Sequence, residues 1–164
     1  DQQNLNTYQI TTLEDLEVSF QKYKERVFTN NSKWFIWSAK YLSPIAAFKP
    51  FILNITDLDL NISIDLFADS LCESSSDPDI SMYSESLKFI FSNTFGFDTL
   101  TVNGCFEEER DGGFSRMTRT FAIENLNNIG ITFRPNIVLN YQVISMFISR
   151  LLAISKKLKL ATKI

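Results

Sequence analysis

The sequence predicts an α+β fold, in which an antiparallel sheet of about five strands carries helices on one face. Apolar residues recur at spacings of three and four in several segments, which is typical of amphipathic helices, and alternate strictly with polar residues in others, which is typical of half-buried strands. The order of helices, strands, helix, strand and helices is typical of the α+β class. Because 164 residues match the usual length of one domain, we expect residues 1–164 to form a single domain.

The first helix is predicted over residues 12–29. Thr11 and Glu14 have the spacing of a capping box, in which the two side chains satisfy free backbone N–H groups at a helix start. The helical spacing comes from five apolar residues: Leu13, Leu16, Phe20, Tyr23 and Val27.

A second helix is predicted directly afterwards. Ser32 is its candidate cap, and Trp34, Trp37 and Tyr41 fall on one face of it. Pro44 interferes with its last turn because proline lacks the N–H that the helix needs.

The clearest strand lies at residues 58–67, where aliphatic and polar residues alternate. Residues 51–55 also alternate, but the phase slips by one residue at Thr56–Asp57, so a tight turn or a bulge is expected there. This register places Asn61 and Ser63 on the polar face. The aliphatic face consists of Leu58, Leu60, Ile62, Ile64 and Leu66.

The middle of the chain predicts a loop at 71–79, a short strand at 80–82 and a helix that Ser84 can cap and Gly96 ends. The apolar residues of this helix are Leu87, Ile90, Phe91 and Phe95. The alternation of Leu100, Val102 and Phe106 predicts a further strand, with Asn103–Gly104 as a hairpin turn and residues 107–113 as an exposed connection.

Two helices are predicted in the last third of the chain. Ser115 is the candidate cap of the first, which carries Met117, Phe121 and Leu126 and ends at Gly130. After Pro135 a final helix of about twenty residues is expected. Its apolar residues include Val138, Val143, Ile144, Phe147, Leu151 and Ile154.

Composition excludes several classes of protein. The chain contains no histidine, so it offers no histidine general base, no histidine-activated nucleophile and no histidine-ligated zinc. A net charge of −3 and a pI near 5.0 do not favour a grip on nucleic-acid phosphates. The two cysteines, Cys72 and Cys105, form neither a disulfide framework nor a metal motif, so a reducing cytoplasm is the expected compartment.

Two groups of acidic residues are candidates for chemistry. The run at 107–111 lies beside two glycines with few apolar neighbours, which favours a solvated loop over acid–base catalysis or calcium binding. Asp57, Asp59 and Asp65 resemble metal ligands, but the strand alternation points Asp59 and Asp65 to solvent. We therefore expect no catalytic residues, no metal and no cofactor.

Surplus apolar residues are the most informative feature. Residues 34–41 and 138–154 are apolar on more than one face, so they form core, line a pocket or make a partner surface. Asn140, Gln142 and Ser145 interrupt the second segment before about eighteen apolar residues accumulate, and no transmembrane segment is expected.

The segment Pro78 to Glu107 resembles the signature of sterol carrier protein type 2 domains. It combines a strand with a polar cap, a helix with a Leu-x-x-Ile pattern and the motif Leu100-x-Val102-x-Gly104 on a second strand. The predicted strand 58–67 and helix 12–29 fit the family's central strand and first helix.

The sequence SESLKFIFSNTFGFDTLTVNG at 84–104 lies between a Trp-rich and a long apolar predicted helix. In this arrangement it also resembles the C-terminal domain of some bacterial metallo-β-lactamase-fold hydrolases. A chain that begins at Asp1 rather than Met fits such an excised domain.

The resemblance implies a non-catalytic accessory domain that binds an apolar ligand, or the apolar part of a substrate, between sheet and helices. The alternative is a structural module for dimerisation or interdomain docking. The expected partners are accordingly an apolar small molecule or lipid and an N-terminal catalytic domain or a second copy, but not nucleic acid. The residues expected to line the pocket are Trp34, Trp37, Phe91, Phe95, Ile144, Phe147 and Leu151.

Overall fold

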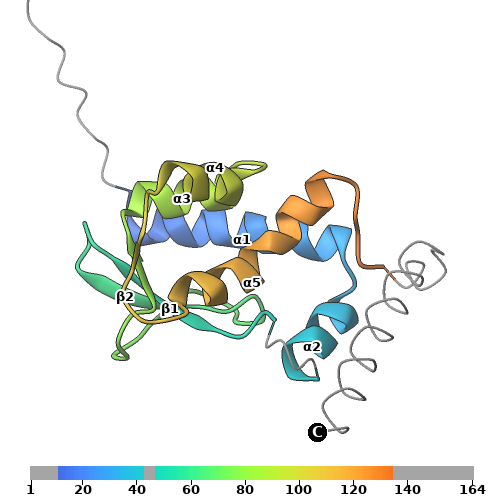
Figure 1. Ribbon diagram of the computed structural model, residues 1–164, viewed down its shortest axis with the longest axis horizontal. Helices are drawn as coiled ribbons and strands as arrows, with labels where there is room; N and C mark the ends of the chain where they lie inside the picture. The colour runs from blue at the N-terminus through green and yellow to red at the C-terminus, as the bar shows by residue number, and fades with distance from the viewer. Residues whose placement is uncertain (1–10, 43–46, 135–164) are drawn as a thin grey trace, which may run out of the picture.

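The computed structural model describes residues 11–42 and 47–134 and has the predicted α+β architecture, a five-stranded sheet with helices on one face (Figure 1). The strand order is β3-β2-β1-β4-β5. Neighbouring strands are antiparallel except β1 and β4, which run parallel. The sheet is therefore mixed rather than purely antiparallel, because the chain returns after β3 to the starting end of β1 before it enters β4.

The strands are β1 (Phe51–Ile55), β2 (Leu60–Ile64), β3 (Cys72–Glu73), β4 (Ile80–Met82) and β5 (Glu107–Glu108). A turn over 56–59 joins β1 to β2, as the phase slip predicts. Strand β2 is shorter than the predicted 58–67, but its register is the predicted one, since Ile62 and Ile64 are fully buried. The predicted loop 71–79 contributes the short edge strand β3.

The helices are α1 (Leu13–Asn30), α2 (Lys33–Tyr41), α3 (Ser84–Ser92), α4 (Gly96–Asn103) and α5 (Gly113–Asn128). The capping box of α1 lies one residue later than predicted. Thr12 Oγ1 accepts the Asp15 N–H at 3.2 Å, and Asp15 Oδ2 accepts the Thr12 N–H at 3.3 Å. The predicted final helix, 138–154, lies outside the described residues.

The strand predicted around Leu100 and Val102 is wrong, because these residues lie on helix α4. Leu100 is buried whereas Val102 is 86% exposed, as expected for residues i and i+2 of a helix, and two apolar residues are too few to establish a strand period. Gly96 permits the helix to cross α3 closely, since a Cβ there would lie 2.6 Å from the Phe89 carbonyl oxygen. Gly104, at φ 63°, ends α4 in a left-handed conformation instead of forming a hairpin turn.

Helix α5 begins at Gly113, two residues before the predicted cap Ser115. Its first turn lies against the backbone of the residue that precedes β4: a Cβ on Gly113 would lie 2.0 Å from the Asp79 carbonyl oxygen. Only glycine fits this approach, so Gly113 determines how closely α5 can approach the sheet.

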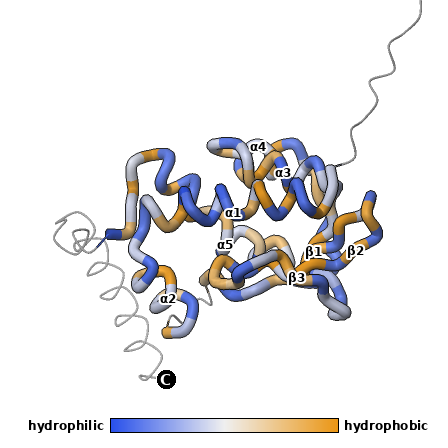
Figure 2. The backbone as a smooth tube through the Cα atoms, turned by 180° about the vertical axis from the view of Figure 1, so that it is seen from behind, coloured by the Kyte–Doolittle hydropathy of each residue, from blue (hydrophilic) through white to orange (hydrophobic). Residues whose placement is uncertain are grey.

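The core between sheet and helices is rich in aromatic rings. Phe121 lies at its centre, with ring centroids 5.7 Å from Tyr23, 5.7 Å from Phe51 and 5.6 Å from Phe97. Figure 2 shows hydrophobic residues recurring along α1 and the strands, as expected for elements with one buried face.

Candidate ligand-binding cleft

The predicted lining residue Phe91 belongs to the closed core. Its side chain is 0% exposed, and its ring lies 5.2 Å from that of Phe20 and 5.6 Å from that of Tyr23. A side chain surrounded in this way stabilises the fold.

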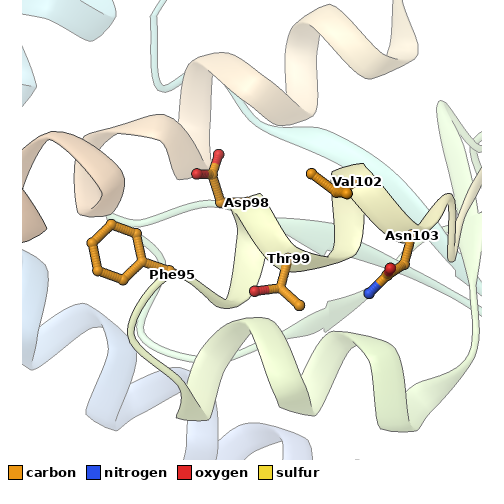
Figure 3. A pocket seen from close by; sticks show the side chains of 5 residues that line it. All are labelled: Phe95, Asp98, Thr99, Val102 and Asn103. Carbon is orange, nitrogen blue, oxygen red and sulfur yellow. The ribbon is translucent and has the colours of Figure 1, made fainter.

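Phe95 lies at the start of α4 and is 41% exposed. With Asp98, Thr99, Val102 and Asn103 it lines a shallow, open depression of about 350 Å³ (Figure 3). Its φ of 60° is a left-handed conformation that is strained for a bulky side chain. Asp98 does not face a ligand freely, because its Oδ1 accepts a hydrogen bond from Asn125 of α5 at 2.9 Å.

Trp34 and Trp37 lie on α2, which Figure 1 shows apart from α3 and α4. They are 71% and 44% exposed. Among the described residues, the structure does not bring them together with Phe91 and Phe95 in one lining. The three remaining predicted residues, Ile144, Phe147 and Leu151, lie outside the described ranges.

A better-formed cleft lies at the carboxyl ends of the parallel strands β1 and β4. Thr56 follows β1, Met82 ends β4 and Tyr83 follows it, and the Thr56 N–H donates to the Met82 carbonyl oxygen at 3.1 Å. From this point the chain leaves β1 for β2 on one side of the sheet. After β4 it runs through α3 and α4 to β5 on the other side. In sheets with parallel strands, such a switch point is a common place for a ligand.

The cleft has a volume of about 350 Å³, which lies at the lower end of the range for small-molecule sites, about 300–1,000 Å³. Its lining joins β4 and the first turn of α3 to the connection between α4 and β5. The lining residues are Thr56, Ser81, Met82, Tyr83, Ser86, Gly104, Cys105, Phe106 and Glu107.

Two contacts hold the walls of this cleft in place. The ring of Phe106 stacks on that of Phe114 from α5, with centroids 5.4 Å apart and planes 3° apart. Across the cleft, Asp57 caps α3, because its Oδ1 accepts the Ser84 N–H at 2.7 Å and its Oδ2 accepts the Ser84 hydroxyl. A carboxylate at the N-terminus of a helix also interacts favourably with the helix dipole. The cleft is therefore preformed.

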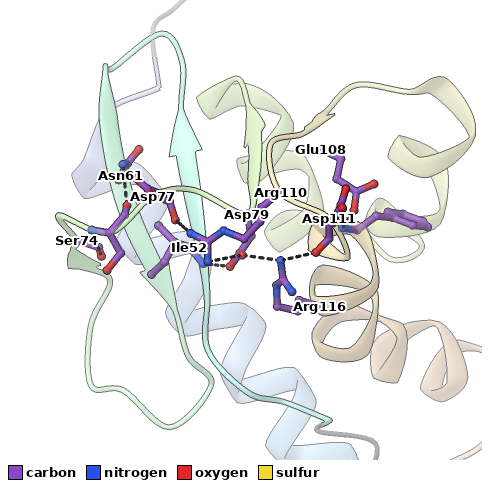
Figure 4. Close-up of polar contacts among 11 residues, drawn as sticks. Ile52, Asn61, Ser74, Asp77, Asp79, Glu108, Arg110, Asp111 and Arg116 are labelled. Atoms are coloured by element: carbon purple, nitrogen blue, oxygen red, sulfur yellow. Dashed lines mark hydrogen bonds and ion pairs between the residues drawn. The ribbon is translucent and has the colours of Figure 1, made fainter.

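Polar contacts around Asp79 support the cleft from the opposite end of β4 (Figure 4). Asp79 Oδ2 accepts the Ile52 N–H at 2.9 Å, and Oδ1 lies 2.8 Å from Arg116 Nη2. The Asp79 carbonyl oxygen accepts the N–H of Glu109 at 3.1 Å. Asp79 thus ties β1, α5 and the segment after β5 to one point.

The shifted pKa values belong to the core rather than to the cleft. Burial raises the pKa of the Tyr23 hydroxyl well above 10, with a further rise from Glu124 and an opposing effect of Arg26. Burial also raises the pKa of Glu124, and the hydrogen bond from Arg26 lowers it. These groups are at the α1–α5 contact, where Arg26 Nε donates to Glu124 Oε1 at 2.9 Å.

The cleft lining combines the apolar side chains of Met82 and Phe106 with hydroxyl, thiol and carboxylate groups. Such a lining can bury an apolar molecule and orient it by one or two hydrogen bonds. Within the described ranges, no group of three His, Cys, Asp or Glu side chains could hold a metal ion, and no helix is long and apolar enough to cross a bilayer.

Sequence reasoning missed this cleft because its residues come from three separated segments. The turn at Thr56–Asp57 was a usable signal, since a phase slip after a strand marks a strand end. The pattern around Cys105 was misleading, because it predicted a strand where the structure has an exposed loop.

Comparisons with known proteins leave the class of this protein open. No family model matches the chain, and no curated protein matches it. The chain is similar to a solved structure of Eis1 from Mycobacterium abscessus, with 15% identity and a TM-score of 0.37. That match covers 44% of this chain and only 20% of the Eis1 chain, and it supports no argument about function.

Proposed function

We propose that this domain is a non-catalytic binding module that holds a neutral, mainly apolar small molecule in the cleft between β1, β4 and α3. The observation that carries the proposal is the preformed cleft at the switch point of the sheet, with Met82 and Phe106 as its apolar surfaces. The Glu107 carboxylate in the lining repels an anionic ligand. Hydroxyls of Tyr83 and Ser86 supply the orienting hydrogen bonds.

We further propose that the domain is accessory to a catalytic domain, of metallo-β-lactamase fold by the resemblance noted above, in a bacterial cytoplasm. The two exposed cysteines, Cys72 and Cys105, are both free, which suits a reducing compartment. In this arrangement the module would hold the apolar part of a substrate while the catalytic domain acts on another part.

The two cysteines also provide a matched test of the cleft. Cys105 lines it, whereas Cys72 lies on β3, at the far edge of the sheet. The variants Cys72→Ser and Cys105→Ser each leave one thiol to react with a bulky, non-fluorescent maleimide. Binding of Nile red, a neutral apolar fluorophore, is then titrated with labelled and unlabelled protein.

We expect a label on Cys105 to weaken Nile red binding about tenfold or more, and a label on Cys72 to leave it unchanged. Bound Nile red should in turn slow the reaction of Cys105 but not that of Cys72. Equal binding after both labels would place the ligand elsewhere. Failure of the unlabelled protein to bind Nile red would overturn the proposal as a whole.

The second candidate function is an association module. The exposed aromatic residues of α2 favour it, since contiguous apolar patches on a surface usually mark contact sites. Light scattering of the full chain at micromolar concentration separates the two functions: an association module forms a dimer without ligand, whereas a binding module remains a monomer.

A further inference from the structure

Helix α2 has two sharply different faces. Ile36 is fully buried and Lys40 is 5% exposed, and Lys40 Nζ lies 2.8 and 2.7 Å from the two carboxylate oxygens of Asp65. This face anchors α2 to the end of β2. The adjoining face carries exposed aromatic rings and is called the aromatic face. Its residues are Trp34, Trp37 and Tyr41.

The aromatic face has helical continuity. Trp34, Trp37 and Tyr41 lie at positions i, i+3 and i+7, and the rings of Trp37 and Tyr41 are 5.3 Å apart. Tyr41 is 59% exposed. A row of three large rings at this spacing can pack against the apolar stripe of another helix.

The chain itself returns to this place before the described residues end. The ring of Phe133 stacks on that of Phe35, next to Trp34, with centroids 4.5 Å apart. The Ser32 N–H donates to the Phe133 carbonyl oxygen at 2.8 Å, and the Arg134 guanidinium donates to the Thr29 carbonyl oxygen at 2.9 Å.

A network of amides reinforces this return. Asn31 Nδ2 donates to Asn127 Oδ1 at 2.7 Å, and Asn127 Nδ2 donates back to Asn31 Oδ1 at 3.0 Å. Asn31 Oδ1 also accepts the Phe133 N–H at 2.9 Å. The segment that follows Arg134 therefore starts at the first turn of α2.

We propose that the aromatic face is the docking site of residues 138–154 of the same chain. The sequence predicts a helix there, and Ile144, Phe147 and Leu151 share the i, i+3, i+7 spacing of the three rings on α2. The three residues 135–137 span at most about 11 Å, which keeps the segment beside α2.

The tether explains why the occupant is this segment rather than a second copy. A short linker gives an intramolecular partner an effective concentration of roughly millimolar, far above that of a second copy at micromolar protein. The inference is independent of the cleft and counts against the association module, because it leaves the aromatic face covered within one chain.

The two tryptophans of the chain are Trp34 and Trp37, so intrinsic fluorescence reports on this face alone. In the full-length monomer we expect blue-shifted emission and slow quenching by acrylamide. Phe147→Glu should shift the emission to the red and raise the quenching constant severalfold. Ser149→Glu is the matched control: it adds the same charge to the opposite face of the predicted helix and should change neither.

Leu151→Gln is a milder variant in case Phe147→Glu prevents folding, and should change the emission in the same direction. Fully quenchable tryptophans in the monomeric wild type would overturn the proposal without any variant. Protection that appears only at concentrations where light scattering detects a dimer would also overturn it, and would assign the face to a second copy.

Discussion

The aromatic residues of this domain fall into two regions with opposite environments. Around Phe121 the rings come from α1, α3, α4, α5 and β1, contact its ring edge to face or at a tilt, and exclude solvent. On α2 three rings lie along one face and are exposed. Similar side chains thus perform different tasks, and the difference is whether other described elements reach them.

The difference shows that aromatic content alone does not locate a site. In the core, rings from five elements converge on one centre, so each contributes to stability. Among the described residues, α2 is held on a side other than its aromatic face, by Ile36 and the Lys40–Asp65 ion pair. Such a face acquires a role only from what covers it.

The largest expected effect tests this contrast directly. Phe121→Ala removes the ring at the centre of the core and should lower the free energy of unfolding by about 3–5 kcal/mol. Trp34 is 71% exposed among the described elements, so Trp34→Ala should cost about 1 kcal/mol if residues 138–154 dock on it as proposed, and less than about 0.5 kcal/mol if they do not. Urea denaturation of both variants measures this. Equal losses would show that the two regions are packed alike.

A smaller effect is expected at the polar cluster that fixes the core to the edge of the sheet. Asp79→Ala leaves the Ile52 N–H without its partner and separates Arg116 from its carboxylate. The expected loss is about 1–3 kcal/mol, as for a buried hydrogen-bonding group left unsatisfied. The arginine is 33% exposed, which moderates the cost. Asp77→Ala, at an exposed side chain nearby, is the control and should change the free energy by less than about 0.5 kcal/mol.

Much of the fold was predictable because its signals are local. The alternation at 51–55 and 58–67, with the slip at Thr56–Asp57, predicted two strands separated by a tight turn or a bulge and the buried face of the second strand. Helical spacing predicted α1, α2, α3 and α5. The parallel pairing of β1 with β4 was not predictable, since it depends on where a loop returns. Helix α4 was misread because its apolar residues are too few to define a period.

The candidate site was harder to predict than the fold. Phe91 and Phe95 lie close in sequence, yet one is in the core and the other at a strained position on the surface. The cleft residues come from segments as distant as Thr56 and Phe106, and no short-range pattern links them. Only the three-dimensional neighbourhood of β1 and β4 brings them together.

The smallest expected effect is a pH dependence at the rim of the core, where burial raises the pKa of Glu124 above its ordinary value of 4.5. A raised folded-state pKa means that the folded protein binds this proton more tightly than the unfolded chain does. The resulting stability is fully present below about pH 4.5 and is lost as the pH rises through the raised value. Glu124→Gln keeps an acceptor for Arg26 but cannot titrate, so its free energy of unfolding should rise relative to wild type between pH 4.5 and 7. Parallel pH profiles for wild type and Glu124→Gln would contradict the assignment.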